Sequence, residues 1–354
     1  MNKLEDMHDV IKRLLESLNK EDKYLAIASI PGPNLELRSG TLPSQDMDYK
    51  HMRNDLIHYF DLSSKCLNDN ILEIEKQYSI NEIINAIGNV LLDSESFKTY
   101  ICSFIKAMEN KLLNKSIFYN KSEVIQEIDL TINQKKLKIF YPDELVSVGL
   151  INEVFIENSY KLEEQVQNVD CIYDLGANIG LSALYFSAYN DNCKIVCVEP
   201  FPDNVKKLER NMKVNGVNAE IVPAAVGNSD ESILLYYSDQ SHALPSLYTV
   251  QNSKVEVQCI PLDKLMTRHD KHYGIKIDIE GSEALLCDYQ DLLKDANFIT
   301  GELHYSKDNI KNSKVDEFYN IINRNFKVTV GRPIVYFVND DVELCYCFRA
   351  VKCV

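Results

Sequence analysis

The fold class is decided by one stretch, Val169-Asp170-Cys171-Ile172-Tyr173-Asp174-Leu175-Gly176-Ala177-Asn178-Ile179-Gly180. It begins with the apolar run of a buried strand, and a helical pattern starts at Leu181. A strand, a glycine turn and a helix in succession predict a ligand site at the carboxyl edge of a parallel sheet. In the turn, Gly176 lets the backbone approach a ligand closely, and Gly180 lets the helix pack tightly on the strand.

Strand-like and helix-like runs alternate on both sides of this turn. They cover residues 170–174, 181–189, 194–199, 203–214, 219–226, 255–260, 274–279, 282–295, 297–303 and 313–324. Three strand-like runs close the chain at 326–330, 334–338 and 343–351, with no helix between them. This alternation predicts an α/β fold with a parallel sheet, and the final pair of strands predicts a reversed, antiparallel hairpin on it.

The N-terminal third has a different pattern. Residues 5–20 predict an amphipathic helix, 30–46 an irregular linker and 47–113 further helices. We assign residues 1–115 to a helical region for oligomerisation or substrate specificity. One of its apolar faces could join a partner subunit in a homodimer, or it could pack on the chain's own second domain.

A hairpin signature follows this helical region. Ile128, Leu130 and Ile132 alternate with polar residues, and a polar turn at 133–136 leads to a second strand at 137–141. The hairpin therefore opens the predicted second domain, residues 116–354.

Composition and charge limit the possible partners and the compartment. The 354 residues carry 38 Lys+Arg and 53 Asp+Glu, so the net charge is 38 − 53 = −15, which disfavours nucleic acid and anionic membrane surfaces. No signal peptide and no transmembrane run are recognisable, so no membrane insertion is expected. The 10 cysteines are too dilute for a disulfide scaffold and include no C-x-x-C pair, which predicts a reducing, cytoplasmic location.

Two acids near the glycine turn indicate the ligand. Dinucleotide sites need G-x-G-x-x-G, but here Asn178 holds the middle position. Asp174 would repel a phosphate and suits an ammonium group instead. Glu199 ends the next strand, 19 residues after Gly180, where a carboxylate can accept both ribose hydroxyls. Together these features predict S-adenosylmethionine as the cofactor and S-adenosylhomocysteine as its product.

Residues 151–305 resemble the FkbM-type branch of the class I S-adenosylmethionine-dependent methyltransferases. The matching blocks are Asp174–Gly180, Glu199–Asn204, Ala224–Gly227, Pro261–Asp263 and Lys276–Glu283, and Glu302-Leu303-His304 fits as well. A departure is Ser282, which stands where the family often has Ala. The resemblance implies a Rossmann-like, seven-stranded sheet and methyl transfer, usually to oxygen, on sugars, polyketides or other natural products.

The resemblance also implies cofactor-binding residues. The methionine and ribose part would be lined by Asp174, Gly176, Ala177, Asn178 and Gly180. Glu199 would hold the ribose hydroxyls, Pro200 would flank the adenine, and Ala225 would lie against the adenine edge. Asp278 is expected to be a further cofactor-binding residue.

The residues for the chemical step are expected on two later strands. On the first of these strands, polar and apolar residues alternate, and the polar ones are Lys276, Asp278 and Glu280. The next strand has the same alternating pattern, with Glu302 and His304 as its polar residues. If the strands are neighbours, these side chains form one constellation.

His304 is the first choice for a general base, because an ordinary histidine pKa of about 6.5 leaves it mostly neutral at pH 7. Asp278 or Glu280 could replace it or orient it. The carboxylates could also bind Mg²⁺, but two or three carboxylates and one histidine do not define a metal site, and none is predicted.

These observations predict an O-methyltransferase acting on a carbohydrate hydroxyl. The acceptor would be a nucleotide-linked sugar or a precursor of a surface polysaccharide such as capsule or lipopolysaccharide. Two alternatives stay open: an O-methyltransferase for a polyketide, peptide or other small natural product, and a non-catalytic cofactor-binding scaffold.

Overall fold

The computed structural model describes residues 122–156, 158–237, 253–266, 272–305, 309–330, 334–338 and 341–352, together with Ser96, Thr99, Tyr100 and Ser103. Apart from these four residues, the helices predicted over 5–20 and 47–113, the linker at 30–46 and the domain boundary after residue 115 lie outside the described part. The chain divides into two compact units between Asn158 and Ser159. No helix among the described residues is long and apolar enough to cross a membrane.

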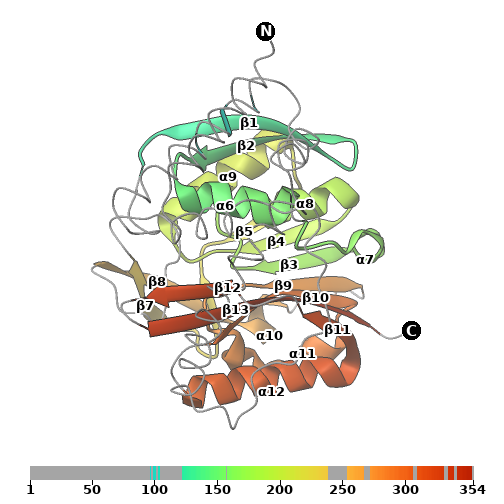
Figure 1. Cartoon of the computed structure of the whole chain (residues 1–354). Helices are drawn as coiled ribbons and strands as arrows, with labels where there is room; N and C mark the ends of the chain where they lie inside the picture. Colours follow the sequence, from blue (N-terminus) through green and yellow to red (C-terminus); the bar gives the residue numbers. More distant parts are fainter. Residues whose placement is uncertain are drawn as a thin grey trace, which may run out of the picture. The chain divides into compact units, whose positions relative to one another are not determined.

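The first unit contains the predicted hairpin (Figure 1). Strands β1 (Ile125–Ile132) and β2 (Lys135–Pro142) pair antiparallel across a turn in which Asn133 and Gln134 have φ of 47° and 63°. Positive φ at both central residues is the geometry that a two-residue hairpin turn requires. Helix α6 (Leu145–Ile151) and the π-helix η1 (Asn152–Ile156) follow. The hairpin prediction is confirmed, and it groups with this unit rather than with the sheet that follows.

The second unit is built on a mixed sheet with the strand order β5-β4-β3-β9-β10-β13-β11, and β12 also pairs with β13. The strands are β3 (Cys171–Leu175), β4 (Lys194–Val198), β5 (Ala219–Val222), β9 (Tyr273–Ile277), β10 (Phe298–Tyr305), β11 (Phe326–Val330), β12 (Ile334–Val338) and β13 (Asp341–Lys352). Pairs from β5 to β10 are parallel, and β13 runs antiparallel to β10, β11 and β12. The predicted Rossmann-like sheet with a reversed C-terminal hairpin is confirmed.

Helices cover both faces of this sheet (Figure 1). They are α7 (Glu163–Gln167), α8 (Leu181–Tyr189), α9 (Pro202–Asn215), α10 (Leu262–Leu265), α11 (Gln290–Asp295) and α12 (Asn309–Asn325), with a 3₁₀ helix η2 (Glu283–Tyr289) before α11. Figure 1 shows α8 and α9 on one face and α11 and α12 on the other. The single helix predicted for 282–295 is therefore a 3₁₀ helix followed by an α-helix.

One predicted strand, residues 219–226, is in fact two. Residues 219–222 form β5 of the main sheet, whereas β6 (Ala225–Gly227) joins β8 (Ser253–Pro261) and β7 (Ser232–Tyr237) in a separate three-stranded sheet. Pro223 lies between them, and a proline has no N–H to donate to a strand ladder. The small sheet packs Leu235 against Phe201 and Ala225, next to the site described below.

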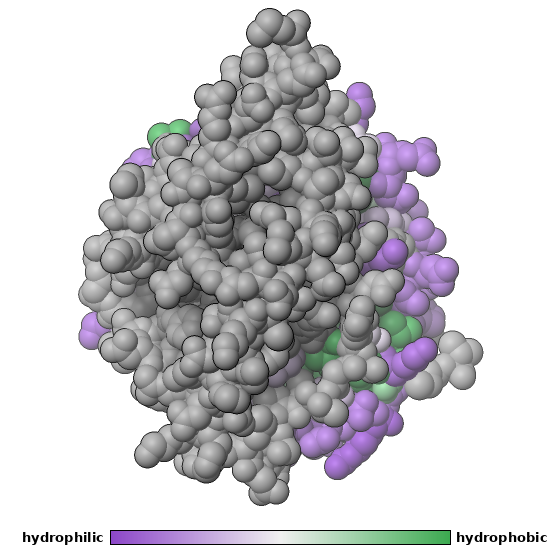
Figure 2. Space-filling view, viewed as in Figure 1, coloured by the Kyte–Doolittle hydropathy of each residue, from purple (hydrophilic) through white to green (hydrophobic). Residues whose placement is uncertain are grey.

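Figure 2 shows that the described surface on the visible face is mainly hydrophilic, with a hydrophobic patch at the lower right and a smaller one at the upper left. The large hydrophobic residues that are exposed among the described ones are Val124, Ile125, Val214 and Leu234. The acid excess is thus accompanied by few exposed apolar side chains in the described part of the chain.

Candidate functional site

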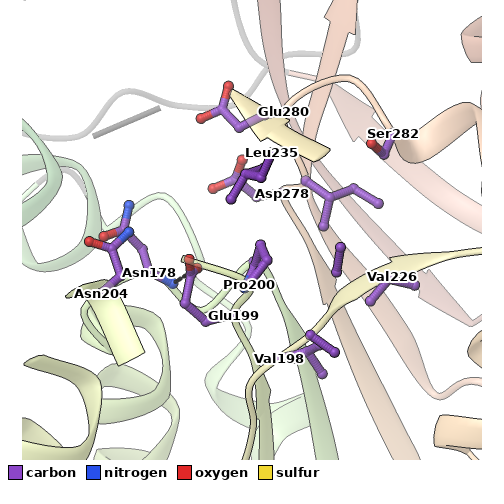
Figure 3. A pocket seen from close by; sticks show the side chains of 14 residues that line it. Asn178, Val198, Glu199, Pro200, Asn204, Val226, Leu235, Asp278, Glu280 and Ser282 are labelled. Atoms are coloured by element: carbon purple, nitrogen blue, oxygen red, sulfur yellow. Dashed lines mark hydrogen bonds between the residues drawn. The ribbon is translucent and has the colours of Figure 1, made fainter. Parts of the chain in front are cut away.

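A pocket of about 600 Å³ opens at the carboxyl ends of β3, β4 and β9 (Figure 3). It is lined by Gly176, Asn178, Val198, Glu199, Pro200, Asn204, Ala224, Ala225, Val226, Leu235, Asp278, Ile279, Glu280 and Ser282. Seven predicted site residues line it: Gly176, Asn178, Glu199, Pro200, Ala225, Asp278 and Glu280. Four others do not: Asp174, Ala177, Gly180 and His304.

The two glycines of the turn allow close contacts with different parts of the chain. Gly176 has φ of +78°, and a Cβ placed there would lie 1.7 Å from the Asp278 carbonyl oxygen. Gly180 has φ of +90°, and a Cβ there would lie 2.6 Å from the Leu208 side chain and 2.8 Å from Met212. The close approach predicted at Gly180 therefore exists, but the neighbour is helix α9 rather than the strand. Only glycine satisfies both the positive φ and the lack of space.

Glu199 lies at the end of β4, where two backbone N–H groups hold its carboxylate. Oε2 accepts a hydrogen bond from Asn178 N–H (2.8 Å) and Oε1 accepts one from Phe201 N–H (2.9 Å). Burial raises the pKa of Glu199 to about 7, although these backbone hydrogen bonds act to lower it. Each oxygen retains a second lone pair, so the carboxylate can accept two hydroxyl groups.

Asp174 is placed differently from the prediction. Its carboxylate is fully buried, accepts a hydrogen bond from Ser182 Oγ (2.5 Å), and lies 3.3 Å from the Lys276 ammonium. Lys276 also lies 3.4 Å from Asp278 and donates to the Gly176 carbonyl (2.6 Å). Asp174 thus faces an ammonium group, but one supplied by the chain itself and outside the pocket. Its direct contact with a ligand stays a prediction that this geometry does not favour.

The remaining residues of the turn are buried or backbone elements. Ala177 is 1% exposed and packs in the core, so any ligand contact would come from its backbone. Asn178 has φ of +48°, and its N–H holds Glu199. Pro200 and Ala225 belong to the apolar part of the pocket lining, together with Val198, Ala224, Val226, Leu235 and Ile279. This apolar lining is suited to a flat apolar group such as a purine.

The predicted constellation on β9 and β10 is confirmed as a cluster, because these strands are parallel neighbours. His304 Nε2 lies 3.3 Å from Glu302 Oε2 and 3.8 Å from Glu280 Oε2. His304 Nδ1 lies 3.0 Å from Glu283 Oε1, which comes from η2. The side chains of Asp278 and Glu280 retain exposures of 21% and 31%. Asp278 and Glu280 are therefore the members of this cluster that a ligand in the pocket can contact.

The cluster keeps His304 protonated. Burial alone would lower the pKa of His304, but the neighbouring Cys345 and Glu283 raise it well above its ordinary value. For Glu302, burial acts to raise the pKa, but the contact with His304 lowers it to about 2. An imidazolium between ionised carboxylates has no free lone pair, so the arrangement does not favour His304 as the base.

Asp278 is better suited than His304 to accept a proton. Burial raises the pKa of Asp278 to about 6, against the lowering effect of Lys276. Burial likewise raises the pKa of Glu280, to about 8, opposed by His304 and helped by the negative charge of Asp278, so Glu280 is mostly protonated at pH 7. A base works best when its pKa lies near the operating pH, and Asp278 meets this condition while remaining mostly ionised at pH 7.

Two groups of side chains have spacing compatible with a metal ion. One consists of Asp278, Glu280 and His304, and the other of Glu302, His304 and Cys345. In each group the potential ligand atoms lie within 4.8 Å of one another. Both groups need His304 as a neutral ligand, whereas its surroundings hold it protonated.

Two polar side chains of the pocket were not predicted as site residues from the sequence. Asn204 and Ser282 are both 1% exposed, and the Asn204 amide atoms and Ser282 Oγ make no hydrogen bond to the described residues. Both line the pocket. Asn204 belongs to the Glu199–Asn204 block, but no local pattern distinguishes an unpaired asparagine from a helix-capping one.

The strand order and the position of this pocket define the class I methyltransferase fold. Residues 174–328 match the methyltransferase FkbM domain. The resemblance seen over 151–305 is thereby confirmed, with a later start and a later end.

The chain is similar to "Methyltransferase sdnD" of Sordaria araneosa, at 25% identity over 154 residues. This match covers 42% of the chain and 58% of the relative, so the chain spans little more than half of that protein. A precorrin-6y C5,15-methyltransferase from Geobacter metallireducens has 13% identity and a TM-score of 0.34, covering 56% of this chain and 88% of its own. An rRNA methylase from Streptococcus thermophilus has 10% identity and a TM-score of 0.35, covering 56% and 96%.

Proposed function

We propose that the protein is an S-adenosylmethionine-dependent O-methyltransferase whose acceptor is a carbohydrate, a nucleotide-linked sugar or a surface-polysaccharide precursor. The observation that carries this proposal is the pocket itself. The buried carboxylate of Glu199 lines the pocket at the end of β4. The partly exposed side chains of Asp278 and Glu280 line it after the end of β9. The match of residues 174–328 to the methyltransferase FkbM domain supports S-adenosylmethionine-dependent methyl transfer.

The residues present fit the cofactor. Glu199 offers two acceptor oxygens for ribose hydroxyls, and the apolar lining with Pro200 and Ala225 suits the adenine. Gly176 leaves the backbone of the turn uncovered, because no side chain can occupy the space beside the Asp278 carbonyl. The cofactor, when bound, supplies an electrophilic methyl group.

The chain's own residues would handle the proton of the acceptor. A sugar hydroxyl is a weak nucleophile at neutral pH, and a positioned base raises the rate by about 10²–10⁴-fold. We assign this task to Asp278, whose pKa of about 6 leaves it mostly ionised at pH 7, whereas the neighbouring Glu280, with a pKa of about 8, is mostly protonated. Protonated His304 would orient Glu280, since their atoms lie 3.8 Å apart.

The polar character of this edge favours a sugar over an apolar acceptor. Two carboxylates that retain solvent exposure are acceptors for hydroxyl groups, whereas a polyketide needs an extended apolar surface. A nucleotide-linked sugar is made in the cytoplasm, so we place the reaction there. The proposed homodimer through residues 1–115 is checked by light scattering on the full chain, which should give twice the mass of 40.6 kDa.

The decisive experiment has two stages. Calorimetric titration with S-adenosylhomocysteine should show binding that Glu199→Ala weakens. Incubation with methyl-labelled S-adenosylmethionine and a panel of sugar nucleotides, oligosaccharides, polyketides and peptides should label a sugar nucleotide or oligosaccharide. Cofactor binding without any methyl transfer would indicate a scaffold, and labelling of a polyketide or peptide alone would overturn the carbohydrate assignment.

A further inference from the structure

The side chain of Asn204 is buried in the pocket wall without a polar partner. It lies in the first turn of α9, is 1% exposed, and neither Nδ2 nor Oδ1 makes a hydrogen bond to the described residues. Burying an unpaired amide costs free energy, and native proteins retain very few such groups. Because Asn204 also lines the pocket, its amide is poised for a ligand rather than for the chain.

The neighbour of this amide is the Glu199 carboxylate. Figure 3 shows Asn204, Asn178 and Glu199 on the same side of the pocket. Burial raises the pKa of Glu199 to about 7, and the Asn204 side chain is near enough to make a small hydrogen-bonding contribution that acts to lower it. Glu199 is held in place by the N–H groups of Asn178 and Phe201, so the carboxylate and the amide form a fixed pair.

This pair selects a particular ligand chemistry. The carboxylate only accepts hydrogen bonds, whereas the amide offers one acceptor oxygen and two donor hydrogens. A phosphate would be repelled by Glu199, and an ammonium group would leave Nδ2 unpaired. Two adjacent hydroxyl groups satisfy both side chains, because each hydroxyl donates one hydrogen and accepts another.

We propose that Asn204 is a second binding residue for the ribose diol of the nucleoside cofactor, acting beside Glu199. This inference rests on the proposed function, since it concerns the same cofactor. One ribose hydroxyl donates to Glu199 and accepts from Asn204 Nδ2. The amide thus gains a hydroxyl partner when the nucleoside is bound, and it contributes to recognising ribose over deoxyribose.

The test compares Asn204→Ala with the wild-type protein in calorimetric titrations of S-adenosylhomocysteine and of its 2′-deoxy and 3′-deoxy analogues. Loss of one hydrogen bond should weaken S-adenosylhomocysteine about 10-fold. The analogue that lacks the contacted hydroxyl should bind both proteins with nearly equal affinity. Asn215→Ala is the matched control, because Asn215 lies on the same helix, bonds the Asn211 carbonyl and does not line the pocket.

Thermal unfolding of the ligand-free proteins separates binding from structure. Asn204→Ala should unfold at or above the wild-type temperature, because the amide it removes has no partner. Asn204→Asp keeps the shape but replaces the donor with a second acid beside Glu199, and it should bind more weakly than Asn204→Ala.

Three outcomes would overturn the inference alone: unchanged affinity of Asn204→Ala for S-adenosylhomocysteine, an equal loss for both deoxy analogues, or a lowered unfolding temperature of the ligand-free variant. An equal loss would place Asn204 against another part of the nucleoside, such as the base. If the wild-type protein binds no S-adenosylhomocysteine, the proposed function itself fails, and this inference with it.

Discussion

Cofactor affinity should depend on pH through one carboxyl group, Glu199. Burial raises its pKa to about 7, and both of its oxygens already accept a backbone N–H. A proton on either oxygen would occupy the lone pair that a ribose hydroxyl needs. Binding therefore selects the ionised form, so affinity is full above pH 7 and is lost as the pH falls through this pKa.

The magnitude follows from the ionised fraction. Apparent affinity scales with the population of the competent form, which rises about 10-fold between pH 6 and pH 8 for a pKa near 7. This corresponds to about 1.4 kcal/mol of binding free energy. We expect the Kd for S-adenosylhomocysteine to fall about 10-fold over this range, with release of a proton detectable in buffers of different ionisation enthalpy.

The control for this prediction is Glu199→Gln, which keeps the shape of the side chain but cannot ionise. It should bind weakly and with the pH dependence removed. Titration of the ligand itself, or of Asp278, contributes equally to both proteins and cancels in the comparison. A wild-type Kd that does not change with pH, or an equal slope in Glu199→Gln, would refute the reasoning.

Further variants test the other parts of the site. Gly176→Ala should abolish binding of S-adenosylhomocysteine in calorimetry, since its Cβ would meet the Asp278 carbonyl at 1.7 Å. Lys276→Met should lower the free energy of unfolding in urea by about 3–5 kcal/mol, because it leaves two buried acids unpaired, and adding Asp174→Asn should recover part of the loss. Asp278→Asn should lower kcat about 10²–10⁴-fold and remove the rise of wild-type kcat with pH through about 6, whereas a larger effect of Glu280→Gln would exchange their roles. Chelator should leave turnover unchanged, and activity that EDTA removes and Mg²⁺ restores would show that the acidic cluster binds a metal.

The prediction of the fold succeeded where local patterns carry the information. The run ending at Leu175 is buried along its whole length, and the turn and helix after it lie where glycine spacing placed them. The hairpin at β1 and β2 follows from alternation and turn residues alone. The prediction failed at 219–227, where sheet membership changes across Pro223, because apolar alternation does not reveal which sheet a strand joins.

The candidate site was predicted in part for a similar reason. Glu199 and Asp278 line the pocket because strand ends in a parallel sheet share one edge. Asp174 occupies the same kind of position, yet its carboxylate pairs with Lys276, about 100 residues away in the chain. Asp174 pairs with Lys276 because β3 and β9 are neighbouring strands in the sheet. The residue spacing within a single segment does not show which strands will be neighbours.

The sequence by itself determined the class of fold, the glycine turn and the acids at the strand ends, because these depend on periodicity and on the conformational freedom of glycine. Only the tertiary structure decided which groups are charged and which are unpaired. His304 is held protonated by Glu283 from η2 and by its neighbours on β13, and the Asn204 amide, buried in the pocket wall, meets the geometry of a hydrogen bond with none of the described residues. Protonation and hydrogen bonding depend on distances of a few ångströms between distant segments, and folding alone brings those segments together.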